Sequence, residues 1–131
     1  MHKGTLRVTT TRKMEMIDIT SEIQQAITEA GRQDGICHVY NPHTTAGLTI
    51  NEGADPDVQT DIIEALKKIV PQDHPYRHAE GNSPAHVMAT LTGNSLTVFV
   101  TSGRLELGTW QRIFFCEFDG PRSRKVHWQL A

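Results

Sequence analysis

The chain has 131 residues, of which 37% are hydrophobic and 21% charged, and its formal net charge at pH 7 is -2. This length and composition predict one globular domain over residues 1–131. The slight negative charge gives no reason to expect a nucleic acid or an anionic membrane as a partner. No apolar run approaches the ~20 residues of a membrane span, and the first residues do not resemble a signal peptide, so we expect a cytoplasmic protein.

The N-terminal part of the chain predicts extended structure. Thr and Val dominate residues 5–11, and apolar residues alternate with polar ones over residues 14–19. Both patterns are typical of strands that have one buried face. The polar residues 12–13 between them predict a hairpin turn.

A first helix is expected to begin at Thr20 or Ser21. Ser21 and Gln24 have the spacing of a capping box, in which each side chain bonds the backbone of the other. Apolar residues then recur at i, i+3, i+4 and i+7 from Ile23, which predicts one buried helix face. Gly31 is a typical residue for the end of this helix.

The middle of the chain predicts two strands and a second helix. Residues 35–40 have apolar side chains on both faces, as a central strand does, and residues 48–50 resume extended structure. Asp55 followed by Pro56 is a strong helix start, and Pro71 stops that helix. A polar loop without periodicity follows.

Ser83 and Pro84 repeat the signal of a capping residue followed by proline, so a short helix is expected as far as residue 93. Strands are then expected over residues 95–101, 109–118 and 124–130, the last two joined by a turn at residues 119–121. Helices and strands interleave, and several connections are short. The sequence therefore predicts an α+β fold with a mostly antiparallel sheet and about three helices.

Two features of the sequence are expected to be structural. Cys37 and Cys116 each lie in an apolar, strand-like run, which predicts two buried, unreactive thiols rather than a disulfide. Arg122, Arg124 and Lys125 form the densest basic patch, and we expect them on a solvated strand or turn.

The segment from His78 to His86 holds the strongest signal for chemistry. If Ser83 caps the helix, His86 lies in its first turn, where the helix dipole favours the neutral imidazole that binds a metal. The same helix start is an anion site suited to phosphate. His78, with Glu80 near it, can fold back through the intervening glycine, and His43 lies in a separate polar loop. Three histidines from two loops fit a divalent metal with an open position, although His86 taken alone fits better a residue that only caps or covers the helix end.

A second polar cluster surrounds residues 103–111. In an extended segment, Thr109 and Gln111 point to one face and Trp110 to the other, so the first two can line a pocket while Trp110 packs. An ordinary solvent-facing strand fits the same pattern. Asn51 and Glu52 end the strand that follows His43, and Glu52 can act as an acid or base, or can orient a histidine.

No phosphate-binding P-loop, dinucleotide-binding glycine motif, nucleophile elbow or HExxH zinc motif occurs in the sequence. This argues against P-loop kinases, Rossmann dehydrogenases, α/β-hydrolases and zincin proteases. The remaining polar motifs, in order, resemble those of a known family, the YjbQ-like proteins, described as secondary thiamine-phosphate synthases. The matching motifs occupy residues 43–52, 80–86, 107–111 and 117–122.

This resemblance implies a YjbQ-like fold, in which the sheet curls into a sandwich or barrel, and assembly as a homotrimer. It also implies that the polar motifs gather in a cleft near the subunit interface, with His43, His78 and His86 as a metal or anion site. The activity that it implies is weak thiamine-phosphate synthesis, joining a pyrimidine pyrophosphate to a thiazole phosphate.

The sequence hypothesis is therefore a small transferase with a divalent metal ion, zinc or magnesium, and a small phosphorylated metabolite as partner. The expected catalytic residues are His43, Glu52, Glu80 and His86. The expected substrate-binding residues are Thr44, Thr45, Asn51, Asn82, Ser83, Arg104, Thr109 and Gln111. Two alternatives remain open: a non-catalytic protein that binds a phosphometabolite, and a metal-dependent hydrolase that uses a metal-bound water.

Overall fold

The computed structural model describes residues 2–131, and within them the chain forms eight β-strands and three α-helices. The elements follow along the chain in the order β1 (Lys3–Thr9), β2 (Glu15–Asp18), α1 (Thr20–Ala30), β3 (Gly35–Tyr40), β4 (Ala46–Glu52), α2 (Pro56–Ile69), α3 (Ser83–Thr92), β5 (Ser95–Thr101), β6 (Arg104–Leu105), β7 (Gln111–Glu117) and β8 (Ser123–Leu130). No helix among these residues has the length and apolar character needed to cross a membrane.

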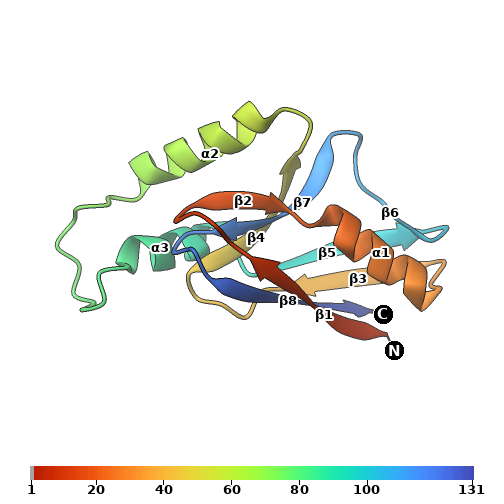
Figure 1. Ribbon diagram of the computed structural model, residues 1–131. Helices are drawn as coiled ribbons and strands as arrows, with labels where there is room; N and C mark the ends of the chain where they lie inside the picture. Colours follow the sequence, from red (N-terminus) through yellow and green to blue (C-terminus); the bar gives the residue numbers. More distant parts are fainter. Residues whose placement is uncertain (1) are drawn as a thin grey trace.

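The strands form two antiparallel sheets that pack against each other as a curled sandwich (Figure 1). One sheet has the order β1-β8-β3-β5-β6, and the other has the order β2-β7-β4. The predicted α+β class with a mostly antiparallel sheet is therefore confirmed. The predicted hairpin at residues 12–13 is wrong, because β1 pairs with β8 in one sheet while β2 pairs with β7 in the other.

Strand β7 is the centre of the molecule, because it is buried on both faces. Ile113 and Phe115 face the core between the two sheets, where α1 adds Ile23 and Ile27. The alternate side chains, including Phe114, face a second core that is closed by the end of α2 and by α3. Such a two-sided apolar strand is fixed in register, because a shift of one residue would exchange its two faces.

Both cysteines are buried, as predicted. Burial raises the pKa of the Cys37 thiol to about 11 and that of the Cys116 thiol to about 12. Neither thiol ionises near neutral pH, so neither is a ready nucleophile.

Helix α1 begins where expected, but without the predicted capping box. The carboxylate of Asp18 accepts a hydrogen bond from the backbone N–H of Thr20, and Ser21 makes no capping bond. Gln24 instead bonds the β5–β6 segment: its side chain donates to the Gly103 carbonyl and accepts from the Leu105 N–H. A contact distant in sequence has therefore displaced the local one.

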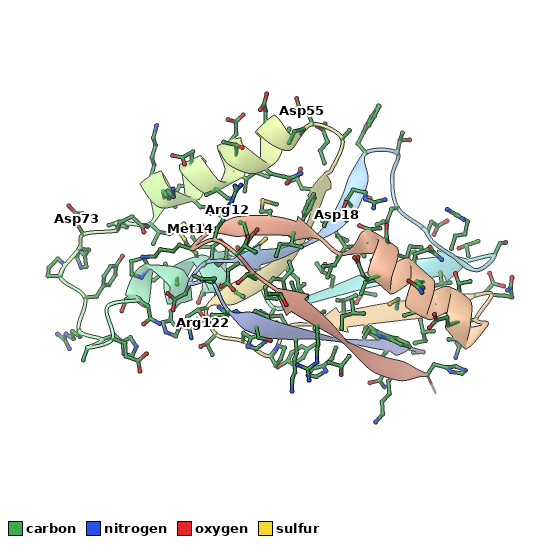
Figure 2. The ribbon with its side chains drawn as sticks, viewed as in Figure 1. Arg12, Met14, Asp18, Asp55, Asp73 and Arg122 are labelled. Atoms are coloured by element: carbon green, nitrogen blue, oxygen red, sulfur yellow. The ribbon has the colours of Figure 1, made fainter. Side chains whose placement is uncertain are left out.

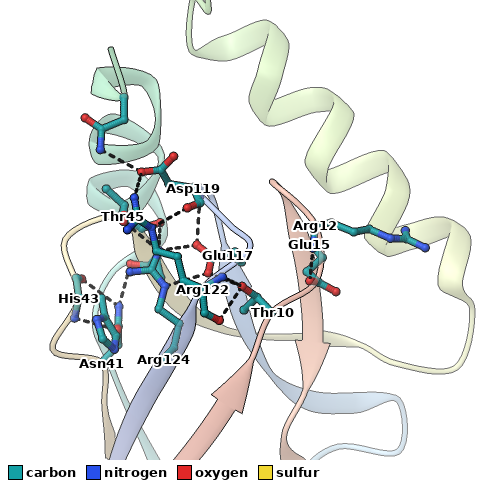
Figure 3. A network of polar contacts seen from close by, with 12 residues as sticks. Thr10, Arg12, Glu15, Asn41, His43, Thr45, Glu117, Asp119, Arg122 and Arg124 are labelled. Atoms are coloured by element: carbon teal, nitrogen blue, oxygen red, sulfur yellow. Dashed lines mark hydrogen bonds and ion pairs between the residues drawn. The ribbon is translucent and has the colours of Figure 1, made fainter. Parts of the chain in front are cut away.

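The two sheets are joined at one corner by four buried polar residues, Thr10, Thr45, Glu117 and Arg124, called here the corner cluster (Figure 3). Arg124 of β8 donates to Glu117 of β7 through both Nε, at 2.8 Å, and Nη2. Thr10 also donates to Glu117 at 2.8 Å, and Arg124 donates to the Thr45 hydroxyl at 2.9 Å. The expectation that Arg124 lies on a solvated surface is wrong, because the Glu117 carboxylate compensates its charge inside the protein.

The Glu117 carboxylate stays ionised in this buried position. Burial acts to raise its pKa, but hydrogen bonds from Arg124, from the Asp119 N–H and from Thr10 outweigh burial, and the pKa of Glu117 lies below its ordinary value. The fold therefore encloses a complete ion pair and not a neutral acid.

The substitution Glu117→Gln should reduce the free energy of unfolding by about 3–5 kcal/mol, because it leaves the Arg124 guanidinium buried without a counter-charge. Urea unfolding at pH 7 and one protein concentration measures this loss. Lys67→Gln is the matched control: it breaks an exposed ion pair with Glu64, and its effect should stay below about 1 kcal/mol.

The same variant should change the acid side of the stability profile. Because the pKa of Glu117 is lowered on folding, its contribution is present above the unfolded pKa of about 4.3 and is lost as the pH falls through the folded value. The Glu117→Gln protein should therefore lose stability less steeply on acidification than the wild type. Equal slopes and an unchanged stability at pH 7 would contradict a buried ion pair.

Candidate functional site

The loop that holds His43 is shaped by the buried side chain of Asn41. Its Nδ2 donates to the carbonyls of His43 and Ala46, at 3.2 and 2.7 Å, and its Oδ1 accepts from the His43 N–H at 3.0 Å. Both the Nδ2 and the Oδ1 atoms of the Asn41 side chain therefore have hydrogen-bond partners. The backbone of His43 is therefore held by a side chain within the core and not by solvent.

The imidazole of His43 is fixed by a second contact, to strand β8. Its Nε2 accepts a hydrogen bond of 2.9 Å from the backbone N–H of Lys125. Burial and the charge of the neighbouring Arg124 lower the pKa of His43, so the ring is neutral at pH 7. A neutral imidazole whose Nε2 accepts must carry its proton on Nδ1, which makes His43 a hydrogen-bond donor at that atom.

His43 and His86 line one recess, the histidine groove, which lies between the His43 loop and α3 and has a volume of ≈ 530 Å³. Thr44 and Thr90 also line it. Helix α3 reaches this position because Gly47 of β4 allows it to approach closely: a Cβ at Gly47 would lie 2.8 Å from the Thr92 side chain. The predicted convergence of His43, Thr44 and His86 therefore exists within a single chain.

His78 and His86 also lie together, with ring centroids 5.4 Å apart in an edge-to-face arrangement. The loop after α2 brings them into contact, as its glycine suggested. Glu80 lies beside His78, with a carboxylate-to-Nε2 distance of 3.8 Å, and both side chains are exposed. In this position Glu80 can form an ion pair with His78 when that histidine is protonated.

The start of α3 differs from the prediction. Asn82 and not Ser83 precedes the helix, and no side chain caps it. The Asn82 carbonyl accepts from the N–H groups of Ala85 and His86, at 3.0 and 3.4 Å, and Pro84 has no N–H to offer. The N–H groups of Ala85 and His86 are therefore already engaged within the chain and are not free for an anion.

The residues of this chain do not fit a metal site of three histidines. Among residues 2–131, no group of three or more His, Cys, Asp or Glu side chains is placed to hold a metal ion. Coordination through Nδ1 of His43 would require that atom to lose its proton while Nε2 still accepts from Lys125. In this position the His43 ring is therefore not suited to be a metal ligand.

The second polar cluster lines another recess, the arginine recess, between α1 and the β6–β7 segment, with a volume of ≈ 540 Å³. Arg104, Thr109, Gln111 and Arg112 line it, and no Asp or Glu does. Arg112 is paired with Asp18 at 2.7 Å. The side-chain oxygen Oε1 of Gln111 accepts a hydrogen bond of 2.9 Å from the Gly108 N–H, so the side-chain Nε2 of Gln111 is left as a donor. The recess therefore offers donors and positive charge.

Trp110 is not packed as expected: 64% of its surface is exposed. Residues 109–110 form a turn, and β7 begins only at Gln111, so the alternation of an extended segment does not apply here. The indole of Trp110 is therefore available for contact with a partner or a ligand beside the recess.

The two recesses lie at opposite ends of the β4–β7 ladder. Ala46 pairs with Glu117 near the histidine groove, whereas Glu52 pairs with Gln111 at the arginine recess. At ~3.3 Å per residue these ends are about 20 Å apart. Asn51 is exposed, and its Oδ1 accepts from the Glu52 N–H, so both residues belong to the end with Gln111. One chain therefore divides the predicted site into two halves.

Sequence reasoning missed the residues that hold this arrangement in place. The sequence predicts that Thr45 contacts substrate, but in the structure Thr45 is buried and accepts a hydrogen bond from Arg124. Asn41, Glu117 and Arg124 were not among the expected site residues. One signal was available: Glu117 is a carboxylate within the apolar run 113–118, and a charge in such a run requires a buried partner.

The chain is a small α+β protein in which one polar recess is lined by histidines and another by arginines. The family model described as "UPF0047 protein YjbQ-like" matches residues 4–131, and the chain belongs to this family. It is 51% identical over 124 residues to the UPF0047 protein YugU of Bacillus subtilis, covering 94% of each chain. It is 49% identical to a UPF0047 protein of Methanocaldococcus jannaschii, covering 92% of this chain and 88% of the relative.

Solved structures agree with the fold. A YjbQ/UPF0047 family protein from Clostridium acetobutylicum superimposes with a TM-score of 0.95 at 48% identity, covering 97% of this chain and 98% of the other. A hypothetical protein from Aeropyrum pernix K1 also gives 0.95 at 38% identity, covering 100% and 98%. The predicted YjbQ-like fold is confirmed.

The tautomer of His43 can be tested directly. Long-range ¹H–¹⁵N spectra should show Nδ1 protonated and Nε2 unprotonated at pH 7, with a titration midpoint below the ordinary value of about 6.5. Because this pKa is lowered on folding, the neutral ring stabilises the protein above about pH 6.5, and that contribution is lost as the pH falls through the folded value. His43→Gln assigns the signals and should remove this pH dependence. A proton on Nε2 at pH 7 would contradict the bond from Lys125.

Proposed function

We propose that this protein binds a small phosphorylated metabolite and acts as a transferase of the thiamine-phosphate synthase type. The observation that carries the proposal is His43, which lines the histidine groove and whose neutral ring, with Nε2 accepting from Lys125, carries a donor at Nδ1. A donor held in place before the ligand arrives suits an anionic oxygen, because no reorganisation is needed on binding.

The chemistry of such a transfer requires charge stabilisation more than a nucleophilic side chain. The thiazole nitrogen supplies an electron pair to the methylene carbon of the pyrimidine, and the carbon–oxygen bond to pyrophosphate breaks. The bonding pair leaves with the pyrophosphate, so charge accumulates on its oxygens. Donors near those oxygens lower the barrier, and proximity of the two substrates supplies much of the rest.

The arginine recess is the part of the proposed site that would bind a second phosphate. Arg104 makes no ion pair among residues 2–131, and the recess is lined by no carboxylate. Arg104, Thr109 and Gln111 together provide a charge, a hydroxyl and an amide N–H for a second phosphate. Planar guanidinium groups suit phosphate because they can donate two parallel hydrogen bonds.

A homotrimer would reunite the two halves of the site. In a cyclic assembly each copy contacts the next through two different surfaces, so the histidine groove of one copy can meet the arginine recess of its neighbour. Exposed Trp110, Phe99 and Leu91 support such an assembly, since 64%, 60% and 57% of their surfaces are uncovered in one chain.

A zinc or magnesium ion remains part of the proposal only as an ion bound jointly by two copies of the chain. The rings of His78 and His86 lie 5.4 Å apart, and an ion bound by both would need a third ligand from another copy in place of His43. The phosphate-handling role of His43 does not depend on this ion.

Pyrophosphate binding tests the proposed site. His43→Gln and His86→Gln should each weaken binding about 10-fold or more in calorimetry, since hydrogen bonds to charged groups contribute about 1.5–3 kcal/mol. His74→Gln is the matched control, because this histidine contacts Tyr76 and lines neither recess. Binding that survives both variants would contradict the proposal.

The reaction is followed by product analysis with the pyrimidine pyrophosphate and thiazole phosphate, with and without a chelator. Condensed product that disappears in Arg104→Gln supports the transferase. Tight binding without product supports the non-catalytic alternative. Hydrolysis that requires an added divalent ion supports the metal-dependent hydrolase.

Light scattering of untagged protein should give the mass of three chains. Trp110→Ser should shift the protein towards smaller species, because it removes a large exposed aromatic group from the expected contact. Ile69→Ser, at the exposed end of α2, is the control and should leave the mass unchanged. A wild-type monomer would contradict the shared site.

A further inference from the structure

The five-stranded sheet has an outer face that no helix covers. In Figure 1 the helices lie on the other side of this sheet, and Figure 2 shows side chains that project from β1 and β8 away from the rest of the molecule. None of the chain's 15 Asp and Glu residues lies in the strands β1, β8, β3, β5 and β6. All charged side chains of this sheet are therefore cationic, although the formal net charge of the chain is -2.

Strand pairing places two rows of side chains next to each other on this face. Each row crosses β1, β8 and β3, and the two rows differ by two positions in every strand, so their side chains point to the same side. Val39 and Trp128 lie between the rows in sequence and pack into the core, so the rows themselves face outwards. The rows consist of Lys3, Gln129 and His38, and of Thr5, His127 and Tyr40.

The two rows line a further hollow, called here the sheet hollow, with a volume of ≈ 560 Å³. All six residues of the rows contribute to its lining together with Gly4 and Trp128, and no carboxylate does. The sheet hollow shares no lining residue with the histidine groove or with the arginine recess. Its volume lies within the range of roughly 300–1,000 Å³ that is usual for sites of small organic ligands.

The two histidines of the sheet hollow are each held by a threonine. Nδ1 of His127 lies 2.9 Å from the hydroxyl of Thr5, and Nδ1 of His38 lies 3.2 Å from the hydroxyl of Thr97. Nε2 of neither ring has a hydrogen-bond partner among residues 2–131. Where the threonine donates to Nδ1, the ring proton is on Nε2, which is then a free donor.

The positive charge on this face has no counter-charge within the chain. Lys3 makes no ion pair among residues 2–131, and neither do Arg7 and Lys125, which lie directly opposite each other in β1 and β8. Like charges that are directly opposite on two strands destabilise the pairing. A bound anion reduces this repulsion, whereas a neutral ligand or a cation does not.

Tyr40 gives the sheet hollow a flat wall. Its side chain is 48% exposed, and its ring makes no contact with another aromatic ring among residues 2–131. Tyr40 is the direct partner of His127 in the next strand, so its ring lies beside the donors of the hollow. Planar rings stack favourably on a free aromatic surface. The ligand that fits this wall therefore combines a negative group with a flat ring.

We propose that the sheet hollow binds a small anionic ligand that carries a planar aromatic ring, with Lys3, His38 and His127 around the negative group and Tyr40 against the ring. This site does not rest on the proposed phosphate chemistry, because none of its residues lines the histidine groove or the arginine recess.

Four probes of the same size test the sheet hollow: benzoate, neutral benzamide, cationic benzamidine and the non-planar anion cyclohexanecarboxylate. Long-range ¹H–¹⁵N spectra of His38 and His127 are followed in the full-length protein. We expect benzoate to shift both histidines saturably and to bind about fivefold more tightly than benzamide, which lacks the charge. Benzoate should also bind about threefold more tightly than cyclohexanecarboxylate, which cannot stack. Benzamidine should not bind.

Two variants separate the charge from the ring. Lys3→Gln should weaken benzoate about fivefold and leave benzamide unchanged. Tyr40→Leu should abolish the preference for benzoate over cyclohexanecarboxylate, an effect that a general loss of stability does not produce. Lys68→Gln, on the exposed surface of α2, is the matched control and should change neither affinity. If Tyr40→Leu does not fold, the four probes on the wild type decide.

The titrations use the native assembly, because Phe99, which belongs to the proposed contact between copies, lies one row beyond His38 on the same face. Equal responses to the two anions and benzamide, a preference for benzamidine, or no response because a second copy covers the face would each overturn the proposal. Pyrophosphate binding should be unchanged in Lys3→Gln, so this site and the proposed phosphate site can fail independently.

Discussion

The buried ion pair between Glu117 and Arg124 is the contact on which the rest of this structure depends. Glu117 ends β7 of one sheet and Arg124 lies in β8 of the other, so the pair joins the two sheets where the chain passes between them. Thr10, which follows β1, and Thr45, which precedes β4, belong to the same cluster. A buried charge is tolerated only with a complete set of partners, so the pair constrains four segments at once.

This constraint extends to the candidate site. The residue after Arg124 donates its backbone N–H to His43, and Thr45, two residues after His43, accepts from Arg124. The His43 loop is thereby held against β8 at both points, and the charge of Arg124 contributes to the lowered pKa of His43. The tautomer of His43, its neutral state and its place in the groove are consequences of one corner of the fold.

Local patterns predicted much of this fold, since they depend on neighbouring residues. The start of α2 at Asp55 and Pro56, the buried face of α1 and the burial of both cysteines all follow from spacing and residue type. Contacts between segments that are distant in the sequence produce no such local pattern of residues. The sequence around residues 12–13 is typical of a hairpin, yet the flanking strands belong to different sheets. Gln24 bonds residues that lie 79 and 81 positions away instead of Ser21. The division of the site into two recesses likewise depends on the β4–β7 register.

A double-mutant cycle on Glu117→Gln and Arg124→Met tests the central role of the corner cluster most directly. Unfolding free energies of the wild type, both single variants and the double variant are measured in urea at one protein concentration, because an oligomer's stability depends on concentration. We expect each single change to lower the free energy of unfolding and the double variant to be more stable than the Glu117→Gln protein, since it no longer buries an unpaired guanidinium. Additive losses, with no coupling between the two positions, would contradict it.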